Sequence, residues 1–171
     1  MEKAFTAGVL TISDKGSQGK REDTSGEIAV KLLQENGFSV LRRKIVPDDP
    51  RQIMDAICEW ADKDCLSLIV TSGGTGLSPS DRTPQAMAEV IDYPVPGIAE
   101  AMRAASGKKT PHAMLSRAMA GVRGRCLIIN LPGSPGGVQD NLGVVLPALP
   151  HALSKLAGDM SDCATPAKPK G

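Results

Sequence analysis

The sequence predicts an α/β domain in which a mostly parallel central sheet is covered by helices on both faces, a three-layer α/β/α arrangement. Short apolar runs alternate along the 171 residues with segments whose apolar residues recur at helical spacing. The apolar runs show little alternation of polar and apolar residues, which is typical of strands buried on both faces of a parallel sheet. Polar or glycine-rich segments follow these runs, as expected where such strands end.

The composition is that of one ordinary globular domain. Hydrophobic residues make up 41% and charged residues 23%, and the net charge of +1 argues against nucleic acid or an anionic membrane as a partner. Aromatic residues, at 2%, are too few to stack single-stranded nucleic acid. We expect one domain over residues 1–158 and a disordered tail over 159–171, which is rich in proline, lysine and alanine.

The sequence shows neither a secretory signal nor a transmembrane run. The four cysteines, Cys58, Cys65, Cys126 and Cys163, have no CxxC spacing. We therefore expect a cytoplasmic protein with reduced, structural cysteines and no membrane partner.

The first strand is expected over residues 7–12, which read AGVLTI. A polar loop over 15–23 follows this strand. Thr24 then has capping-box spacing to Glu27, so we expect a helix that begins at Thr24 and ends at residues 36–37, an Asn-Gly pair.

The second strand is expected over residues 38–46. Three basic residues at 42–44 interrupt its apolar pattern, which indicates an edge strand or a partly exposed one. Asp49 precedes Pro50, and this pair predicts the N-cap and first residue of the next helix. Capping thus explains Asp49 but leaves Asp48 without a structural role.

The most informative stretch is residues 66–84. An apolar strand ends at residues 71–72, glycines follow at positions 73, 74 and 76, and Thr83 with Pro84 predicts the N-cap and first residue of a helix. A strand, a glycine loop and a helix N-terminus in series form an anion-binding site, because free amides and the positive end of the helix dipole face the ligand. The sequence therefore predicts a phosphate or nucleotide site here.

Asp81 lies within this stretch, where a carboxylate would repel a bare phosphate. A divalent cation between the two, usually Mg²⁺, would remove the repulsion. The alternative is that Asp81 only marks the start of the helix. Asp48 and Asp81 could share such a metal on neighbouring strand ends, although spacing alone makes this the minority interpretation.

The following segment is expected to be irregular over residues 92–97, which contain two prolines, and helical over 98–105. A short helix is expected to start at Thr110 and to include Ser116 and Arg117. Three methionines are expected in the core rather than in a cofactor site: Met102, Met114 and Met119.

A last buried strand is expected over residues 126–130. It leads into a second glycine-containing loop over 131–137 and a helix over 138–156, which Pro147 and Pro150 should kink or break.

Four strands of this prediction have polar carboxyl ends, at residues 13–14, 47–48, 71–76 and 130–137. Because parallel strands of an open α/β sheet bind ligands at their carboxyl edge, we expect these four ends to form one ligand site. At Asp14 the alternative, a turn in which the side chain satisfies its own backbone, is equally compatible with the sequence.

Two motifs in this pattern resemble a known family. TSGGTGLSPSDRTP (71–84) and NLPGSPGG (130–137) are similar to motifs of the molybdenum cofactor biosynthesis domain of the MogA/MoaB type, also found as the G domain of gephyrin. The resemblance covers about residues 5–157 and includes the short segments ISD (12–14), PD (47–48) and LSR (115–117). The glycine-loop motif is specific, and the short segments add weight only together.

The resemblance implies the molybdenum cofactor biosynthesis protein fold, a homotrimer, and binding of molybdopterin, a pterin with a dithiolene and a terminal phosphate. MogA-type members transfer an adenylyl group from Mg-ATP to that phosphate, giving adenylyl-molybdopterin and pyrophosphate. The expected activity is therefore that of a molybdopterin adenylyltransferase, with Mg²⁺ as cofactor, ATP as co-substrate and a molybdenum insertase as a downstream partner.

Two alternatives stay open from the sequence. MoaB-like members could act as carriers or partner proteins that bind molybdopterin without turnover, and the chain could be an unrelated nucleotide-binding α/β domain. The presence of both aspartates favours catalysis. Insertases have additional domains that this sequence lacks, and we therefore expect a function other than molybdate insertion. The choice between a molybdenum and a tungsten pathway also stays open.

Carried over by position, the resemblance implies that Asp48 and Asp81 are the catalytic residues and the Mg²⁺ ligands. For Arg117 the alternative role is a surface or interface salt bridge, and for Ser116 that of a helix hydroxyl. The substrate-binding residues that the resemblance implies are Ser13, Asp14, Ser72, Gly73, Gly74, Thr75, Gly76, Thr83, Glu100, Ser116, Arg117, Pro132, Gly133 and Ser134.

Overall fold

The structure is a computed structural model that describes residues 4–160. The tail expected over 159–171 lies outside these residues from position 161 onward. The strands are β1 (Thr6–Ile12), β2 (Ser39–Val46), β3 (Leu68–Ser72), β4 (Tyr93–Pro94), β5 (Ala120–Arg123) and β6 (Cys126–Leu131). The helices are α1 (Asp14–Ser17), α2 (Thr24–Glu35), α3 (Pro50–Cys58), α4 (Thr83–Val90), α5 (Pro96–Gly107), α6 (Pro135–Val145) and α7 (Leu149–Leu156), with the π-turn η1 (Glu59–Lys63) and the 3₁₀ turns η2 (Pro111–Leu115) and η3 (Leu146–Ala148).

The strands form one six-stranded sheet in the order β2-β1-β3-β6-β5-β4. The first four of these strands are parallel, whereas β4 and β5 add an antiparallel edge. The expected edge position of the basic strand, β2, is confirmed. This arrangement confirms the prediction of a mostly parallel sheet.

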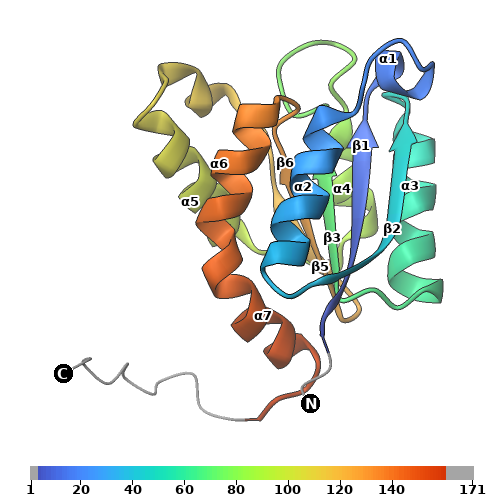
Figure 1. The fold of residues 1–171 in the computed structure, drawn as a ribbon, viewed down its shortest axis with the longest axis vertical. Helices are drawn as coiled ribbons and strands as arrows, with labels where there is room; N and C mark the ends of the chain where they lie inside the picture. The colour runs from blue at the N-terminus through green and yellow to red at the C-terminus, as the bar shows by residue number, and fades with distance from the viewer. Residues whose placement is uncertain (1–3, 161–171) are drawn as a thin grey trace.

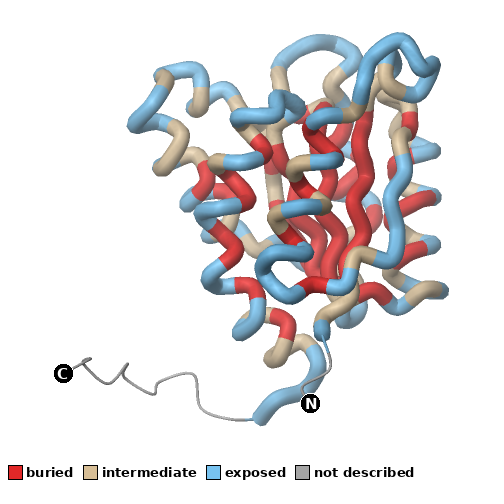
Figure 2. The backbone as a smooth tube through the Cα atoms, viewed as in Figure 1, coloured by how far each residue is buried: buried red, intermediate tan, exposed pale blue. Residues whose placement is uncertain are grey.

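Helices cover both faces of the sheet, which confirms the three-layer prediction (Figure 1). Side chains of α2, α5, α6 and α7 pack on one face, and those of α3, η1 and α4 on the other. The central strand β3 is buried on both faces, as its continuous apolar run predicts (Figure 2). Among residues 4–160, none of the helices has the length and hydropathy needed to span a bilayer.

The four parallel strands run in the same direction, so their carboxyl ends meet at one edge of the sheet, as expected (Figure 1). Two glycine loops leave this edge, one after β3 and one after β6. The amide of Gly73 donates to the carbonyl of Leu131 at 3.2 Å, which joins the two loops at their base. The convergence predicted from the sequence is therefore present.

Two features at the start of the chain differ from the prediction. The first turn of the expected loop over 15–23 is the short helix α1, because the Ser13 hydroxyl accepts from the amide of Gly16 at 3.0 Å and so caps it. The N-cap of α2 is Asp23 rather than Thr24, and its carboxylate accepts from the Gly26 amide at 2.9 Å. Asp and Thr are both good caps, and the sequence alone could not separate adjacent candidates.

The prediction of Thr83 as the N-cap of α4 is also wrong. Thr83 is already helical and fully buried, and its hydroxyl donates to the carbonyl of Gly73 at 2.9 Å. The residue at the cap position, Arg82, makes no capping hydrogen bond. Thr83 thus ties the helix to the glycine loop instead of capping the helix.

The region after α4 contains the largest errors. Residues 92–97, expected to be irregular, include β4, which pairs with β5, a strand missed because its sequence, AGVR, is short and contains glycine. Ser116 and Arg117 lie after the short 3₁₀ turn rather than inside a helix. Met102 is buried as expected, but Met114 is 75% exposed and does not belong to the core.

The last helical region is broken as Pro147 and Pro150 predict. α6 ends at Val145, the 3₁₀ turn η3 follows, and α7 begins at Leu149. The helix starts at Pro135, earlier than expected, because the Ser134 hydroxyl accepts from the Gly137 amide at 3.1 Å and acts as the N-cap. The N-terminus of α6 therefore lies directly at the second glycine loop.

Candidate active site

A pocket of about 690 Å³ opens at the carboxyl edge of the parallel strands. Its walls come from the two glycine loops and from the N-terminal ends of α2 and α6, and its floor from the ends of β1 and β3. The sequence-predicted residues that line it are Ser13, Asp48, Ser72, Gly73, Gly74, Asp81, Gly133 and Ser134.

The first glycine loop requires glycine at two positions. Gly73 has a φ of +103°, and a Cβ there would collide with the backbone carbonyl of Ile12. Gly74 has a φ of +66°, and a Cβ there would collide with the hydroxyl of Thr83. A Cβ on Gly133 would lie 3.3 Å from the Cα of Gly73, so the two loops pack backbone against backbone.

Arg117 holds the first glycine loop from outside the pocket. Its Nε donates to the carbonyl of Gly76 at 2.8 Å, and its Nη2 donates to the carbonyl of Asp81 at 2.6 Å. Its backbone amide donates to the carbonyl of Thr75 at 2.8 Å. Three bonds from one residue thus fix both ends of the segment that carries Asp81.

Asp14 and Asp48 bridge the ends of β1 and β2. The Asp48 amide donates to Asp14 Oδ1 at 2.9 Å, and the Asp14 amide donates to Asp48 Oδ2 at 3.2 Å. Asp14 therefore satisfies a neighbouring strand end rather than its own backbone, and it does not line the pocket. The bridge positions the Asp48 carboxylate beside Gly74, with Oδ1 3.4 Å from where a Cβ on that glycine would stand.

The Asp48 carboxylate lies close to other negative charges in the pocket region. Burial raises the pKa of the Asp48 carboxyl, and the charges of Asp14 and Asp81 raise this pKa further, while the hydrogen bond from the Asp14 amide opposes the shift. The carboxylate of Asp81 accepts from the amide of Ser78 at 3.0 Å, which fixes its orientation. A bound cation would relieve the repulsion between these carboxylates.

The donor set suits one kind of metal. Within residues 4–160, no three histidine, cysteine or acidic side chains are grouped closely enough to form a cage for an ion. Mg²⁺ is usually held by one or two carboxylates together with substrate phosphates and water. Asp48 and Asp81, which line the same pocket as the glycine loop, fit this mode of binding.

Several of the predicted residues lie outside the pocket. Thr75, Gly76, Thr83 and Arg117 build and support the first glycine loop. Ser116 and Pro132 line a separate cavity of about 40 Å³ between α5, α6 and the second loop. Glu100 is exposed on α5 and lines neither cavity. The structure therefore does not bring Glu100, Ser116 and Asp48 into one pocket.

One wall of the pocket was not predicted from the sequence. The lining residues that were not expected to bind a ligand are Thr11, Ile12, Gly16, Arg21, Glu22, Asp23, Thr24, Ser25 and Pro135. The signal available was Thr11, a hydroxyl residue within an apolar strand, followed by a long polar segment that leads into α2. The segment could not be placed from the sequence, because its path back across the strand ends depends on tertiary packing.

Comparison with known proteins gives consistent matches over most of the chain. Residues 8–151 match the family model described as "Probable molybdopterin binding domain". A molybdopterin adenylyltransferase of Helicobacter pylori is 39% identical over 154 residues, which cover 89% of this chain and 88% of that protein. Gephyrin of Dictyostelium discoideum is 41% identical over 162 residues, which cover 89% of this chain but only 22% of gephyrin.

A solved structure shares the fold and much of the sequence. The molybdopterin biosynthesis enzyme MoaB of Thermus thermophilus superposes with a TM-score of 0.86 at 52% identity, covering 91% of this chain and 98% of that one. The pocket-forming segments lie within the matched range, from the end of β1 to the N-terminus of α6.

Proposed function

The chain belongs to the family of molybdopterin-binding domains, and from this premise we propose that it acts in molybdenum cofactor biosynthesis as a molybdopterin adenylyltransferase. The observation that carries the proposal is the pairing of two aspartates, Asp48 and Asp81, with a glycine loop in one pocket. The reaction joins the terminal phosphate of molybdopterin to the α-phosphate of ATP and releases pyrophosphate. Both substrates carry phosphates, which suits a pocket formed by loop backbone and helix N-termini.

Asp48 and Asp81 would hold Mg²⁺ in this reaction. When bound, the ion would neutralise charge on the ATP phosphates as the phosphorus is transferred. The chain itself positions the reactants. The Asp14–Asp48 bridge fixes one carboxylate, and the hydrogen bond from Ser78 fixes the other.

The glycine loop contributes shape rather than charge. Gly73 and Gly74 let the loop take positive φ angles and pack closely against Ile12 and Thr83, and this conformation places the loop backbone at the pocket, where a phosphate could bind. We propose that Arg117 acts as a positioning residue for Asp81 and the loop, since its guanidinium donates to their carbonyls. Molybdopterin would extend from the pocket along the loop that Arg117 holds, toward the neighbouring Ser116.

We propose two further properties of the protein. The exposed apolar side chains Leu77, Met114 and Leu115 support assembly into a homotrimer. The unpaired cysteines among the described residues, Cys58, Cys65 and Cys126, support a cytoplasmic location. Light scattering on the intact protein tests the assembly, since a trimer has three times the 17.9 kDa chain mass and a monomer would contradict it.

Pyrophosphate release from Mg-ATP, with and without molybdopterin, tests the activity. We expect release that requires molybdopterin and is lost in Asp81→Asn. Asp55→Asn, which changes an exposed aspartate on α3 outside the pocket, is the matched control and should retain full activity. Molybdopterin binding without any release in the unchanged protein would contradict the enzyme assignment and indicate a carrier.

A further inference from the structure

Two buried hydroxyls on the floor of the pocket have no hydrogen-bond partner. They are Thr11 Oγ1 and Ser72 Oγ, in residues that are 7% and 2% exposed. Within residues 4–160 they are the buried side-chain polar atoms without a partner. Burying an unpaired hydroxyl costs free energy, and a ligand that enters the pocket could complete its hydrogen bonding.

The two hydroxyls lie side by side. Thr11 of β1 is the register partner of Ser72 of β3, and neighbouring strands lie about 4.8 Å apart. Thr11 is on the same face of β1 as Val9, and Ser72 is on the same face of β3 as Val70, because side chains alternate along a strand. Both valines belong to the core beneath α2 and α6, so both hydroxyls point toward that side of the pocket.

The N-termini of two long helices line the same pocket as these hydroxyls. α2 begins at Thr24 and α6 at Pro135, and both residues line the pocket. The first amides of a helix have no intrahelical acceptor. Asp23 caps the amide of Gly26 and Ser134 that of Gly137, which leaves earlier first-turn amides in both helices without such caps. The positive ends of two helix dipoles and the two hydroxyls are therefore available to the same ligand in this pocket.

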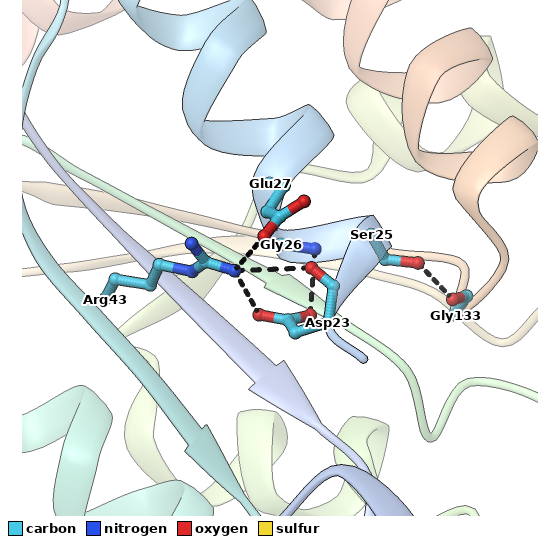
Figure 3. A network of polar contacts seen from close by, with 6 residues as sticks. All are labelled: Asp23, Ser25, Gly26, Glu27, Arg43 and Gly133. Carbon is cyan, nitrogen blue, oxygen red and sulfur yellow. Dashed lines mark hydrogen bonds and ion pairs between the residues drawn. The ribbon is translucent and has the colours of Figure 1, made fainter. Parts of the chain in front are cut away.

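A polar network holds this arrangement in place (Figure 3). The Ser25 hydroxyl donates to the carbonyl of Gly133 at 2.7 Å, so the N-terminus of α2 is tied to the loop that leads into α6. Arg43 of β2 pairs with the carboxylate of Asp23 at 3.0 Å and with that of Glu27 at 3.8 Å. Arg43 thereby offsets the negative charge that the cap residue would otherwise present to an anion.

We propose that Thr11 and Ser72, together with the N-termini of α2 and α6, form a phosphate-binding subsite separate from the carboxylates Asp48 and Asp81. The subsite takes a phosphate or pyrophosphate group, supplied either by the nucleotide or by molybdopterin. This inference rests on the proposed adenylyl transfer and adds to it the position of one phosphate. The hydroxyls and the first-turn amides are neutral hydrogen-bond donors that can contact a phosphate directly, so we expect some binding to persist without metal.

Calorimetric titration of pyrophosphate into the full chain tests the subsite directly. The buffer contains EDTA, which removes metal. We expect Thr11→Val and Ser72→Ala each to raise the dissociation constant about tenfold or more, the change expected for losing one hydrogen bond to a charged group. Thr11→Ser keeps a hydroxyl and should bind nearly as well as the unchanged chain. Asp81→Asn should not weaken metal-free binding.

Thermal unfolding without ligand supplies a second readout. Thr11→Val removes an unpaired buried hydroxyl, so its melting temperature should stay the same or rise by a few degrees. Thr6→Val, at the opposite end of β1, is the matched control because the Thr6 hydroxyl accepts from the Ser67 amide at 3.1 Å. That variant should unfold at a lower temperature than the unchanged chain but bind pyrophosphate with the same affinity.

The outcomes separate the subsite from the enzyme assignment. The same titration with molybdopterin distinguishes the two sources of the phosphate. Unchanged affinity for both pyrophosphate and molybdopterin in Thr11→Val and Ser72→Ala would overturn the subsite even if adenylyl transfer is observed. Weaker binding of molybdopterin alone would assign the subsite to the molybdopterin phosphate. Hydroxyl-dependent pyrophosphate binding without any adenylyl transfer would support the subsite and contradict only the activity.

Discussion

Replacing Arg117 with lysine should loosen the first glycine loop without removing a positive charge. Arg117 uses two different nitrogens, Nε and Nη2, to reach the carbonyls of Gly76 and Asp81 at 2.8 and 2.6 Å. A lysine has one nitrogen and cannot reproduce this fork. At least one charge-assisted hydrogen bond is lost, which is worth ~1.5–3 kcal/mol.

Arg103→Lys is the matched control. Arg103 is also half-buried and also binds two carbonyls, those of Ser116 and Ala118, but it does so through a single nitrogen, Nη1. One lysine nitrogen can reproduce more of this contact, and neither carbonyl belongs to the glycine loop. We therefore expect a smaller loss of stability and little effect on the loop.

Hydrogen exchange and urea unfolding measure the two effects. In Arg117→Lys the amides of residues 73–82 should exchange roughly 10–150-fold faster, the factor that corresponds to ~1.5–3 kcal/mol of local opening. Molybdopterin-dependent pyrophosphate release should fall because Asp81 is no longer held. If molybdopterin affinity collapses while loop exchange and stability are unchanged, Arg117 contacts the substrate directly and the positioning role is refuted.

Three further variants test other contacts. Gly73→Ala should lower the free energy of unfolding, measured with urea, by more than ~2 kcal/mol, because its Cβ would collide with Ile12 and its φ is positive. Wild-type stability would contradict the loop geometry. Thr83→Val should lose ~1–3 kcal/mol because the Gly73 carbonyl is left unpaired. Asp62→Asn should lose ~0.5–1 kcal/mol near pH 7. Arg123 lowers the pKa of Asp62, so this difference should vanish as acid protonates the wild-type carboxylate; persistence at low pH would refute the pairing.

Much of the fold follows from local patterns in the sequence. β1, β3 and β6 are short apolar runs between polar segments, and such runs become buried strands because they are too short for a core helix and pair their backbone groups with neighbouring strands. The helix that begins at Pro50 was predictable from its cap, and the break at Pro147 from the missing amide. The hairpin of β5 with β6 was not predictable, because its pairing rather than its composition defines it.

The active-site pocket was likewise only partly predictable from the sequence. The chain order of strands and glycine loops was enough to bring Asp48, Asp81 and the loop to one edge, since parallel strands must end there. The roles of Thr83 and Arg117 were not accessible, because a hydroxyl or guanidinium that binds a distant carbonyl leaves no local pattern. The same holds for Arg43, which reaches the α2 cap from a different strand.

The sequence by itself determined the α/β class, the edge of the sheet that carries the site, and the acidic and glycine residues placed there. These depend on interactions between residues close in the chain and on the rule that parallel strands share a direction. Only the tertiary structure decided which of those residues face the pocket and which support it. It also revealed the unpaired hydroxyls of Thr11 and Ser72, because whether a polar group has a partner depends on every element packed around it.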